Sequence, residues 1–318
     1  MDNNSLQDCI IDGSYKVDLL LGTGGSSRVY SCVDTHHNFY ALKVIRKDRK
    51  FSQGLSKALL ETEIKIMQET QAHPNILSGY HINTSGVVNV NGEKHDIMYC
   101  IMELAKKGAI KTFIQRSGHF DEEIVKFYAI QITNSLAYLH SKGYAHMDVK
   151  VDNILLDENY NSKLADLGVG VKTDFGYSSS RCGTKQYIAP EILKKSNDDQ
   201  FNAFKADAYS LGVTLYVMLT GNFPSTAEST LFTGDTSDNL SESHEEKEDN
   251  CLVPTLSREC KDLLSCLLNQ DPEKRLSVFD ALEHSWISNP GDCIPAFEVY
   301  MEMKAREDYI IGSCSGSS

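Results

Sequence analysis

The sequence predicts an α+β protein with two lobes: a small antiparallel β-sheet lobe that carries one key helix, and a larger, mainly α-helical lobe. Two observations predict this division. Strand-type patterns fill most of the first hundred residues, whereas helix-type patterns dominate after Gly108. The chain has 318 residues, of which 41% are hydrophobic, and this is enough to bury a sizeable core.

The first lobe begins with strands separated by turns. Runs of aliphatic, aromatic and β-branched residues predict five strands, at Tyr15–Leu21, Val29–Val33, Phe39–Val44, Ile76–Ile82 and Ile97–Glu103. Between the third and fourth strands, apolar residues recur at helical spacing from Leu59 to Met67. One helix therefore interrupts the strands. A linker at Leu104–Gly108 ends this lobe.

The second lobe reads as helical. Asp121, Glu122 and Glu123 suit the positive end of a helix dipole, and an apolar stripe from Ile124 to Leu136 follows them. The nearly apolar stretch Ala208–Leu219 is only about 12 residues long, too short to cross a membrane, so we expect a buried core helix. A last helix is predicted at Ala296–Tyr309, followed by a flexible end that starts at Gly312.

Charge and cysteine usage narrow the possible functions. Forty-four acidic against 31 basic side chains leave a formal charge of -13, which argues against nucleic acid as a partner. The nine cysteines are scattered without a Cys-x-x-Cys pair, as expected in a reducing compartment. The first residues show neither a signal segment nor a myristoylation glycine. We therefore expect a cytoplasmic protein, with nuclear access open and no membrane partner.

An acidic insertion is predicted within the helical lobe. Residues 225–250 are rich in Ser and Thr and hold eight acids and one lysine, so they carry -7 of the net charge. This composition is typical of a flexible, solvated loop. A role in attracting basic substrates is the alternative.

A glycine-rich turn lies between the first two predicted strands. Leu21-Gly-Thr-Gly-Gly-Ser-Ser-Arg-Val29 would let backbone N–H groups approach a triphosphate without Cβ clashes. A simple hairpin turn explains this motif equally well. A dinucleotide site would require a strand-to-helix context, which is missing here.

Further motifs follow in a fixed order, and each would supply a different part of a phosphoryl-transfer site. They are Lys43 on an otherwise apolar strand, Glu63 on the following helix, His146-Met-Asp-Val-Lys-Val-Asp-Asn153, Asp166-Leu-Gly168 and Gly183-Thr-Lys-Gln-Tyr-Ile-Ala-Pro-Glu191. Alone, each residue would be ordinary: a solvated lysine, a surface acid or a turn aspartate. Together they predict phosphoryl transfer, with a pair of Lys43 and Glu63 that would aim the ammonium at the α and β phosphates.

With these motifs the chain resembles the eukaryotic protein kinase family, over about residues 14–289. The resemblance implies the bilobal protein kinase fold, with an N-lobe at 14–103, a hinge at 104–108 and a C-lobe at 109–289. Residues 1–13 would then be an N-terminal extension and residues 290–318 a C-terminal tail. His284-Ser-Trp286 most resembles the calcium/calmodulin-dependent kinase group.

The resemblance also implies roles for individual residues, with ATP and Mg²⁺ as cofactors. Asp148 would act as catalytic base and Lys150 would offset charge on the γ-phosphoryl group. Asn153 and Asp166 would bind Mg²⁺. The nucleotide would be held by Leu21, Gly22, Gly24, Gly25, Ser27, Val29, Ala41, Lys43, Glu63, Met102, Glu103, Ala105 and Leu155. Glu191 with Arg275, and Asp207, would be structural.

Three departures from the family pattern bear on activity. Ser27 replaces a glycine and Leu167 replaces a phenylalanine, and both changes leave the chemistry intact. Met147 replaces the arginine that in many relatives pairs with a phosphorylated activation segment. Our hypothesis is therefore that the segment from Asp166 to Glu191 does not require phosphorylation.

Lys150 and Thr184 indicate serine or threonine as the acceptor. The predicted partners are proteins with such hydroxyls, with a preference for basic motifs suggested by Asp152, and a regulatory partner at the C-terminal tail. Two alternatives stay open. A catalytically silent scaffold would have lost one of the motif residues, and a kinase of small molecules would lack Ala189-Pro-Glu191.

Overall fold

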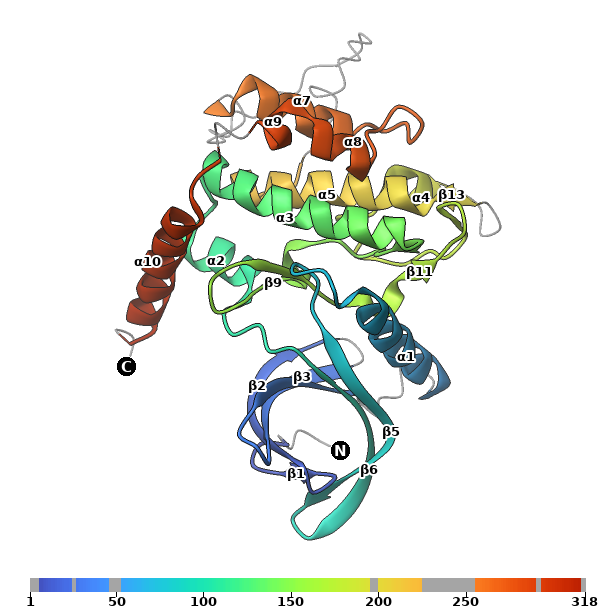
Figure 1. The fold of residues 1–318 in the computed structure, drawn as a ribbon, viewed down its shortest axis with the longest axis vertical. Coiled ribbons are helices and arrows are strands. Elements are labelled where there is room, and N and C mark those ends of the chain that lie inside the picture. The colour runs from blue at the N-terminus through green and yellow to red at the C-terminus, as the bar shows by residue number, and fades with distance from the viewer. Residues whose placement is uncertain are drawn as a thin grey trace, which may run out of the picture.

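The computed structural model describes residues 6–24, 27–45, 53–194, 200–224, 255–289 and 293–315. A β-sheet with one helix forms one part of the molecule, and helices form most of the other (Figure 1). This agrees with the α+β arrangement that the sequence predicts. The predicted acidic insertion and Gly25 lie outside the described residues.

Six strands form the sheet, in the order β1-β2-β3-β4-β6-β5. They are β1 (Ile10–Ile11), β2 (Tyr15–Thr23), β3 (Ser27–Asp34), β4 (Phe39–Ile45), β5 (Gly79–Val90) and β6 (Glu93–Met102). All pairs are antiparallel, and β1 also bridges β5 at Ile11 and Val88, which closes the sheet on itself. Alternating apolar side chains such as Val17, Leu42 and Ile101 fill its interior.

Residues 6–13 belong to this sheet. Leu6 is buried, and β1 pairs on both sides. Beside β1, the Asp12 carboxylate accepts hydrogen bonds from the Tyr99 hydroxyl at 2.6 Å, from Asn83 at 2.7 Å and from the Val87 N–H at 2.7 Å. The segment that precedes the expected domain is thus fixed to the long β5–β6 hairpin.

The strand predicted at Ile76–Ile82 is wrong in its first residues. β5 begins only at Gly79, where it pairs with Met102. Ile76 instead forms a parallel bridge with Leu164 of the helical part, and the Leu77 N–H donates to the Leu164 carbonyl. The apolar pattern was correct, but these residues connect the two parts of the molecule.

Nine helices are described. They are α1 (Gln53–Thr70), α2 (Ile110–Ser117), α3 (Glu122–Ser141), α4 (Pro190–Lys194), α5 (Ala203–Thr220), α7 (Arg258–Leu267), α8 (Val278–Glu283), α9 (Ser285–Ser288) and α10 (Ala296–Ser315). Helix α5 contains the predicted core helix and is buried along nearly its whole length. None of the helices in the described ranges is long and apolar enough to cross a membrane.

Short strands and two 3-10 turns connect these helices around the site. They are β7 (Gly108–Ala109), β8 (Tyr144–Ala145), η1 (Val151–Asn153), β9 (Ile154–Leu156), β10 (Ser162–Leu164), η2 (Leu167–Val169), β11 (Val171–Lys172), β12 (Tyr177–Ser178) and β13 (Phe201–Asn202). Strands β9 and β10 form a hairpin that β7 joins. The loops on either side of this hairpin carry the predicted chemistry.

The tail helix α10 is longer than predicted. It continues through Gly312 to Ser315, so the flexible end expected from Gly312 is wrong at its start. Val299, Met303 and Ile310 join the hydrophobic core, and α10 packs against α2 and α3. Arg306 adds polar contacts, because its guanidinium donates to the carbonyls that follow α2 and lies over the Phe120 ring.

Candidate active site

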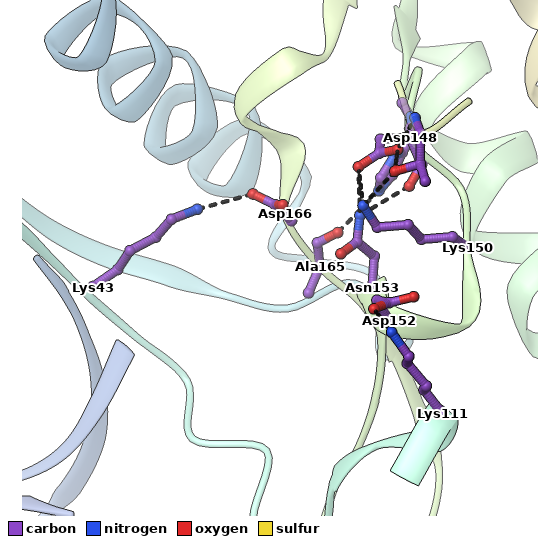
Figure 2. A network of polar contacts seen from close by, with 10 residues as sticks. Lys43, Lys111, Asp148, Lys150, Asp152, Asn153, Ala165 and Asp166 are labelled. Carbon is purple, nitrogen blue, oxygen red and sulfur yellow. Dashed lines mark hydrogen bonds and ion pairs between the residues drawn. The ribbon is translucent and has the colours of Figure 1, made fainter. Parts of the chain in front are cut away.

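A lysine–carboxylate cluster joins the two parts of the molecule. Lys43 lies on β4, and its Nζ donates to Glu63 Oε2 of α1 at 2.6 Å and to Asp166 Oδ1 at 2.9 Å. Figure 2 shows the second contact, in which Lys43 reaches from the sheet to the segment that follows β10. Glu63 is almost fully buried. The predicted Lys43–Glu63 contact is therefore present in the structure.

Lys43 and Asp166 stabilise each other's charges, whereas burial raises the pKa of Glu63 despite its contact with Lys43. Burial lowers the pKa of Lys43, but the carboxylates of Glu63 and Asp166 outweigh this effect and raise it, so the ammonium stays charged. The Lys43 ammonium in turn holds the pKa of Asp166 below its ordinary value. The Asp166 side chain is 49% exposed. An ammonium and an ionised, accessible carboxylate thus face one another.

A second cluster surrounds Asp148, which lies between β8 and η1. Asp148 Oδ2 accepts from Lys150 Nζ at 2.6 Å and from Asn153 Nδ2 at 3.2 Å. Its Oδ1 accepts from the N–H and the hydroxyl of Thr184, each at 2.8 Å. Lys150 Nζ also donates to the Thr184 hydroxyl oxygen at 2.7 Å. These residues hold the Asp148 carboxylate in one orientation.

Hydrogen bonds to Asp207 of α5 hold the loop that carries Asp148. The buried Asp207 carboxylate accepts from the N–H groups of His146 and Met147 at 2.7 and 2.8 Å, and it contacts the His140 ring at 2.9 Å. Met147 has φ 69°, a left-handed conformation that costs a side chain such as methionine some strain. Asp207 supplies the hydrogen bonds that offset this strain.

Asn153 and Asp166 fit a magnesium site by their donor chemistry. Asn153 uses its amide nitrogen to bond the Asp148 carbonyl at 2.9 Å, so its Oδ1 is the atom suited to a metal. Mg²⁺ prefers oxygen ligands and commonly takes one or two from protein, with phosphates completing the shell. In the described ranges no group of three or more His, Cys, Asp or Glu residues could hold a metal alone. A site shared with a nucleotide is consistent with the donor chemistry of Asn153 and Asp166.

The predicted glycine-rich turn connects β2 and β3. Gly22 pairs with Val29, and the Gly24 N–H donates to the Ser27 carbonyl at 2.9 Å. A Cβ added at Gly22 would meet no atom within 4 Å, so the turn faces open space. Ser27 itself is buried within β3, where it pairs with Ile45. The structure describes both arms of the turn but not its tip, residues 25 and 26, so its role with a triphosphate stays a prediction.

Five of the residues predicted to hold the nucleotide belong to the main hydrophobic core or pack against it. They are Val29, Ala41, Met102, Ala105 and Leu155. Leu21 is half-exposed at the mouth of the turn. The Glu103 N–H donates to the Ser78 carbonyl, and the Ala105 carbonyl accepts from Gly108. The Glu103 carbonyl and the Ala105 N–H are thus the hinge groups best suited to a base.

Comparison with known proteins identifies the family. The model of the protein kinase domain matches residues 15–287. The chain belongs to the protein kinase family. It is 33% identical over 283 residues to an Aurora kinase of Dictyostelium discoideum, covering 88% of this chain and 66% of that protein.

Two plant kinases are similar to a comparable degree. CBL-interacting protein kinase 11 of Oryza sativa subsp. japonica is 31% identical over 288 residues, which cover 88% of this chain and 53% of that protein. CBL-interacting serine/threonine-protein kinase 5 of Arabidopsis thaliana is 31% identical over 292 residues, which cover 87% and 59%. The chain thus spans about half to two thirds of the length of these curated relatives.

The activation segment of this protein kinase packs against Met147 through apolar contacts. Met147 is 5% exposed and belongs to a cluster with Ala189 and Ile192, against which Val169 and Cys182 also pack. Burial raises the pKa of the Cys182 thiol. An uncharged side chain fills the position where many relatives carry an arginine.

A buried ion pair fixes the end of the same segment. Arg275 donates to Glu191 through two parallel hydrogen bonds of 2.7 and 2.9 Å. The Arg275 side chain is fully buried and also donates to the carbonyls of Asn269 and Lys205. The sequence prediction that Glu191 and Arg275 are paired inside the helical lobe is confirmed.

One contact beside the kinase's catalytic loop was not predicted from the sequence. Asp152, which suggested a preference for basic substrates, is paired with Lys111 of α2. No spacing rule connects two residues 41 positions apart, so only the fold reveals this pair. The direct bonds from Thr184 to Asp148 were also missed, although Thr184 lies in a predicted motif.

Proposed function

We propose that this protein transfers the γ-phosphoryl group of ATP to serine or threonine hydroxyls of protein substrates. The observation that carries the proposal is the meeting of two clusters, Lys43–Glu63–Asp166 and Asp148–Lys150–Asn153–Thr184, from segments up to 141 positions apart. The Ala165 N–H, next to Asp166, donates to the Asn153 carbonyl at 2.9 Å and so connects them (Figure 2). Phosphoryl transfer relies mainly on positioning and on electrostatic stabilisation. Both clusters consist of charged and amide groups in fixed orientations, as that chemistry requires.

Asp148 would accept the proton of the attacking hydroxyl. Its carboxylate takes four hydrogen bonds, and the one from the Thr184 hydroxyl can be released from Oδ1 by rotation about a single bond. A substrate hydroxyl can therefore replace it at Oδ1 without any movement of the loop. Lys150 would remain within reach of the developing charge.

Asn153 and Asp166 would hold Mg²⁺ through oxygen atoms, and Lys43 would bind the phosphates. Mg²⁺, when bound, supplies positive charge that neutralises the phosphate oxygens. Glu63 orients Lys43 through the 2.6 Å contact. The Glu103 carbonyl and the Ala105 N–H would bind the adenine base.

The proposed acceptor class is supported by Lys150 and Thr184, which contact one another and Asp148. One of the similar plant proteins is itself named a serine/threonine-protein kinase. Location in the cytoplasm and a regulatory partner at the tail remain predictions, whereas the predicted preference for basic motifs depends on Asp152, which is paired with Lys111. The name of the plant relatives records an interaction partner for those proteins.

The test is transfer of γ-phosphate from Mg-ATP to a peptide library that contains Ser, Thr and Tyr acceptors. Asp148→Asn should lower kcat/KM by about 10³-fold, because a positioned base contributes about 10²–10⁴. Asp96→Asn removes the same charge from an exposed position on β6 and serves as the control. Tyrosine as the preferred acceptor would contradict the proposed class. No transfer by the wild type, with ATP binding intact, would favour the silent scaffold.

We also propose that activity does not require phosphorylation of the activation segment. Met147 has no charge with which to bind a phosphate, and its apolar cluster already contacts the segment at Val169 and Cys182. After phosphatase treatment, checked by mass spectrometry of residues 166–191, kcat/KM should remain within about tenfold of the untreated value. A loss of about 100-fold or more, restored by rephosphorylation, would contradict this proposal.

A further inference from the structure

A second charged pair lies beside the proposed catalytic base. Lys111 projects from the first turn of α2, and its Nζ contacts Asp152 Oδ1 of η1 at 2.5 Å. Figure 2 shows the pair next to Asn153, with Asp152 on the same loop as Asp148 and Lys111 reaching it from α2. The two side chains are 40% and 37% exposed. The pair is therefore accessible to a molecule bound at Asp148.

A bound peptide would pass close to this pair. Asn153, the residue after Asp152, donates to both the carbonyl and the carboxylate of Asp148. An extended chain advances about 3.3–3.6 Å per residue. With the acceptor hydroxyl at Asp148, a side chain two or three positions along the peptide would reach the pair. Its charge would then compete with Lys111 or with Asp152.

An exposed ion pair of this kind is weak, so a substrate charge can displace either partner. A basic substrate side chain that binds Asp152 must first displace Lys111 from it. An acidic side chain that binds Lys111 must likewise displace Asp152. The two exchanges are nearly balanced. A free Asp152 carboxylate, by contrast, would attract a basic side chain without any loss.

On this basis, which rests on the proposed function, we propose that Lys111 is a specificity-determining residue. It satisfies the Asp152 carboxylate and so suppresses the selection for a basic side chain that Asp152 alone would exert. The prediction of a basic preference from Asp152 treats this residue as free, and its pairing with Lys111 removes that basis. Substitution of Lys111 should create a preference for basic side chains, and substitution of Asp152 should create a preference for acidic ones.

The experiment compares Lys111→Met, Asp152→Asn and the double variant with the wild type. Peptides with Arg, Ala or Glu at each of the positions around the acceptor are tested for kcat/KM and, by fluorescence anisotropy, for Kd. Lys106→Met is the matched control, because Lys106 forms a similar exposed pair with Glu158 at 2.6 Å. Thermal unfolding of each variant confirms that it is folded.

In the wild type, kcat/KM for the Arg peptide divided by kcat/KM for the Ala peptide should lie within about twofold of unity at the affected position. Lys111→Met should raise this ratio of kcat/KM values about fivefold, the factor at the upper end of the range for an exposed ion pair. Asp152→Asn should favour Glu instead, and the double variant should return to the wild-type ratios. Lys106→Met should match the wild type.

Unchanged ratios in Lys111→Met would overturn the proposal, and so would a strong wild-type preference for Arg that Asp152→Asn abolishes. The binding measurement separates this result from failure of the proposed function. A wild type that binds peptides in the predicted pattern but transfers no phosphate would contradict the catalytic proposal while supporting the role of Lys111.

Discussion

Two ion pairs of this molecule each join distant segments of the chain, yet they differ in burial. Glu191 and Arg275 hold the end of the activation segment, with side chains that are 6% and 0% exposed. Lys107 and Glu307 hold the tail helix α10 to the hinge at 2.9 Å, and each side chain is 21% exposed. Each pair joins a basic side chain to a glutamate, and the larger difference between them is the access of water.

This difference predicts unequal consequences of mutation. When one partner of a buried pair is removed, the other charge remains without water and without a partner, which is strongly destabilising. At the edge of the protein, water can replace the lost partner, so the cost is small. The pair of Glu191 and Arg275 therefore fixes the activation segment firmly to the helical lobe, whereas the pair of Lys107 and Glu307 adds little to the docking of the tail.

The largest effect is expected at Arg275. Arg275→Met should lower the free energy of unfolding by about 3–5 kcal/mol, because it leaves Glu191 buried and unpaired. Chemical denaturation with a fluorescence readout measures this change. The double variant Glu191→Met with Arg275→Met should recover a large part of the loss. A loss of less than about 1 kcal/mol in the single variant would show that burial does not govern this pair.

The sequence predicted buried contacts better than exposed ones. The motif residues Lys43 and Glu63 meet as expected, because a strand and the helix that follows it carry them in a fixed order. The pairing of Lys111 with Asp152 could not be predicted, since exposed charges follow no pattern that specifies a partner. The sequence did not place Asp12 at the β5–β6 hairpin for the same reason.

Element ends were also less predictable than their centres. Gly312 suggested the end of the tail helix, but α10 continues to Ser315. A glycine within a helix costs only about 1 kcal/mol relative to alanine, which the packing of Met303 and Ile310 can offset. Ile76 was read as the start of a strand because an apolar pattern does not reveal which part of the molecule a residue contacts.

A smaller effect is expected at Glu307. Its carboxylate accepts from Lys107 and, at 2.7 Å, from the Tyr160 hydroxyl. Glu307→Gln should weaken the docking of α10 by about 1 kcal/mol, measured as faster hydrogen exchange in residues 296–313. Asp308→Asn removes the same charge next door, where the carboxylate pairs with Lys304 of the same helix, and serves as the control. Equal exchange in both variants would contradict the assignment.

The pH dependence of tail docking sharpens this test. Burial raises the pKa of Glu307, but the hydrogen bonds from Tyr160 and Lys107 outweigh burial and hold it below its ordinary value. The contribution of Glu307 is therefore complete above the ordinary carboxyl pKa of about 4.3 and is lost as the pH falls through the lower, folded value. The difference in hydrogen exchange of α10 between wild type and Glu307→Gln should shrink as the pH falls over that range. A constant difference would contradict the sign of the shift.

The most direct test of the proposed function is a single-turnover measurement of phosphate transfer to a Ser/Thr peptide. Phosphatase-treated wild type and Asp148→Asn are compared at saturating Mg-ATP, with ATP binding checked separately for both. The wild type should transfer phosphate, and Asp148→Asn should bind ATP yet transfer it about 10³-fold more slowly. Equal rates in the two proteins would contradict the assignment of Asp148 and the catalytic account built on it.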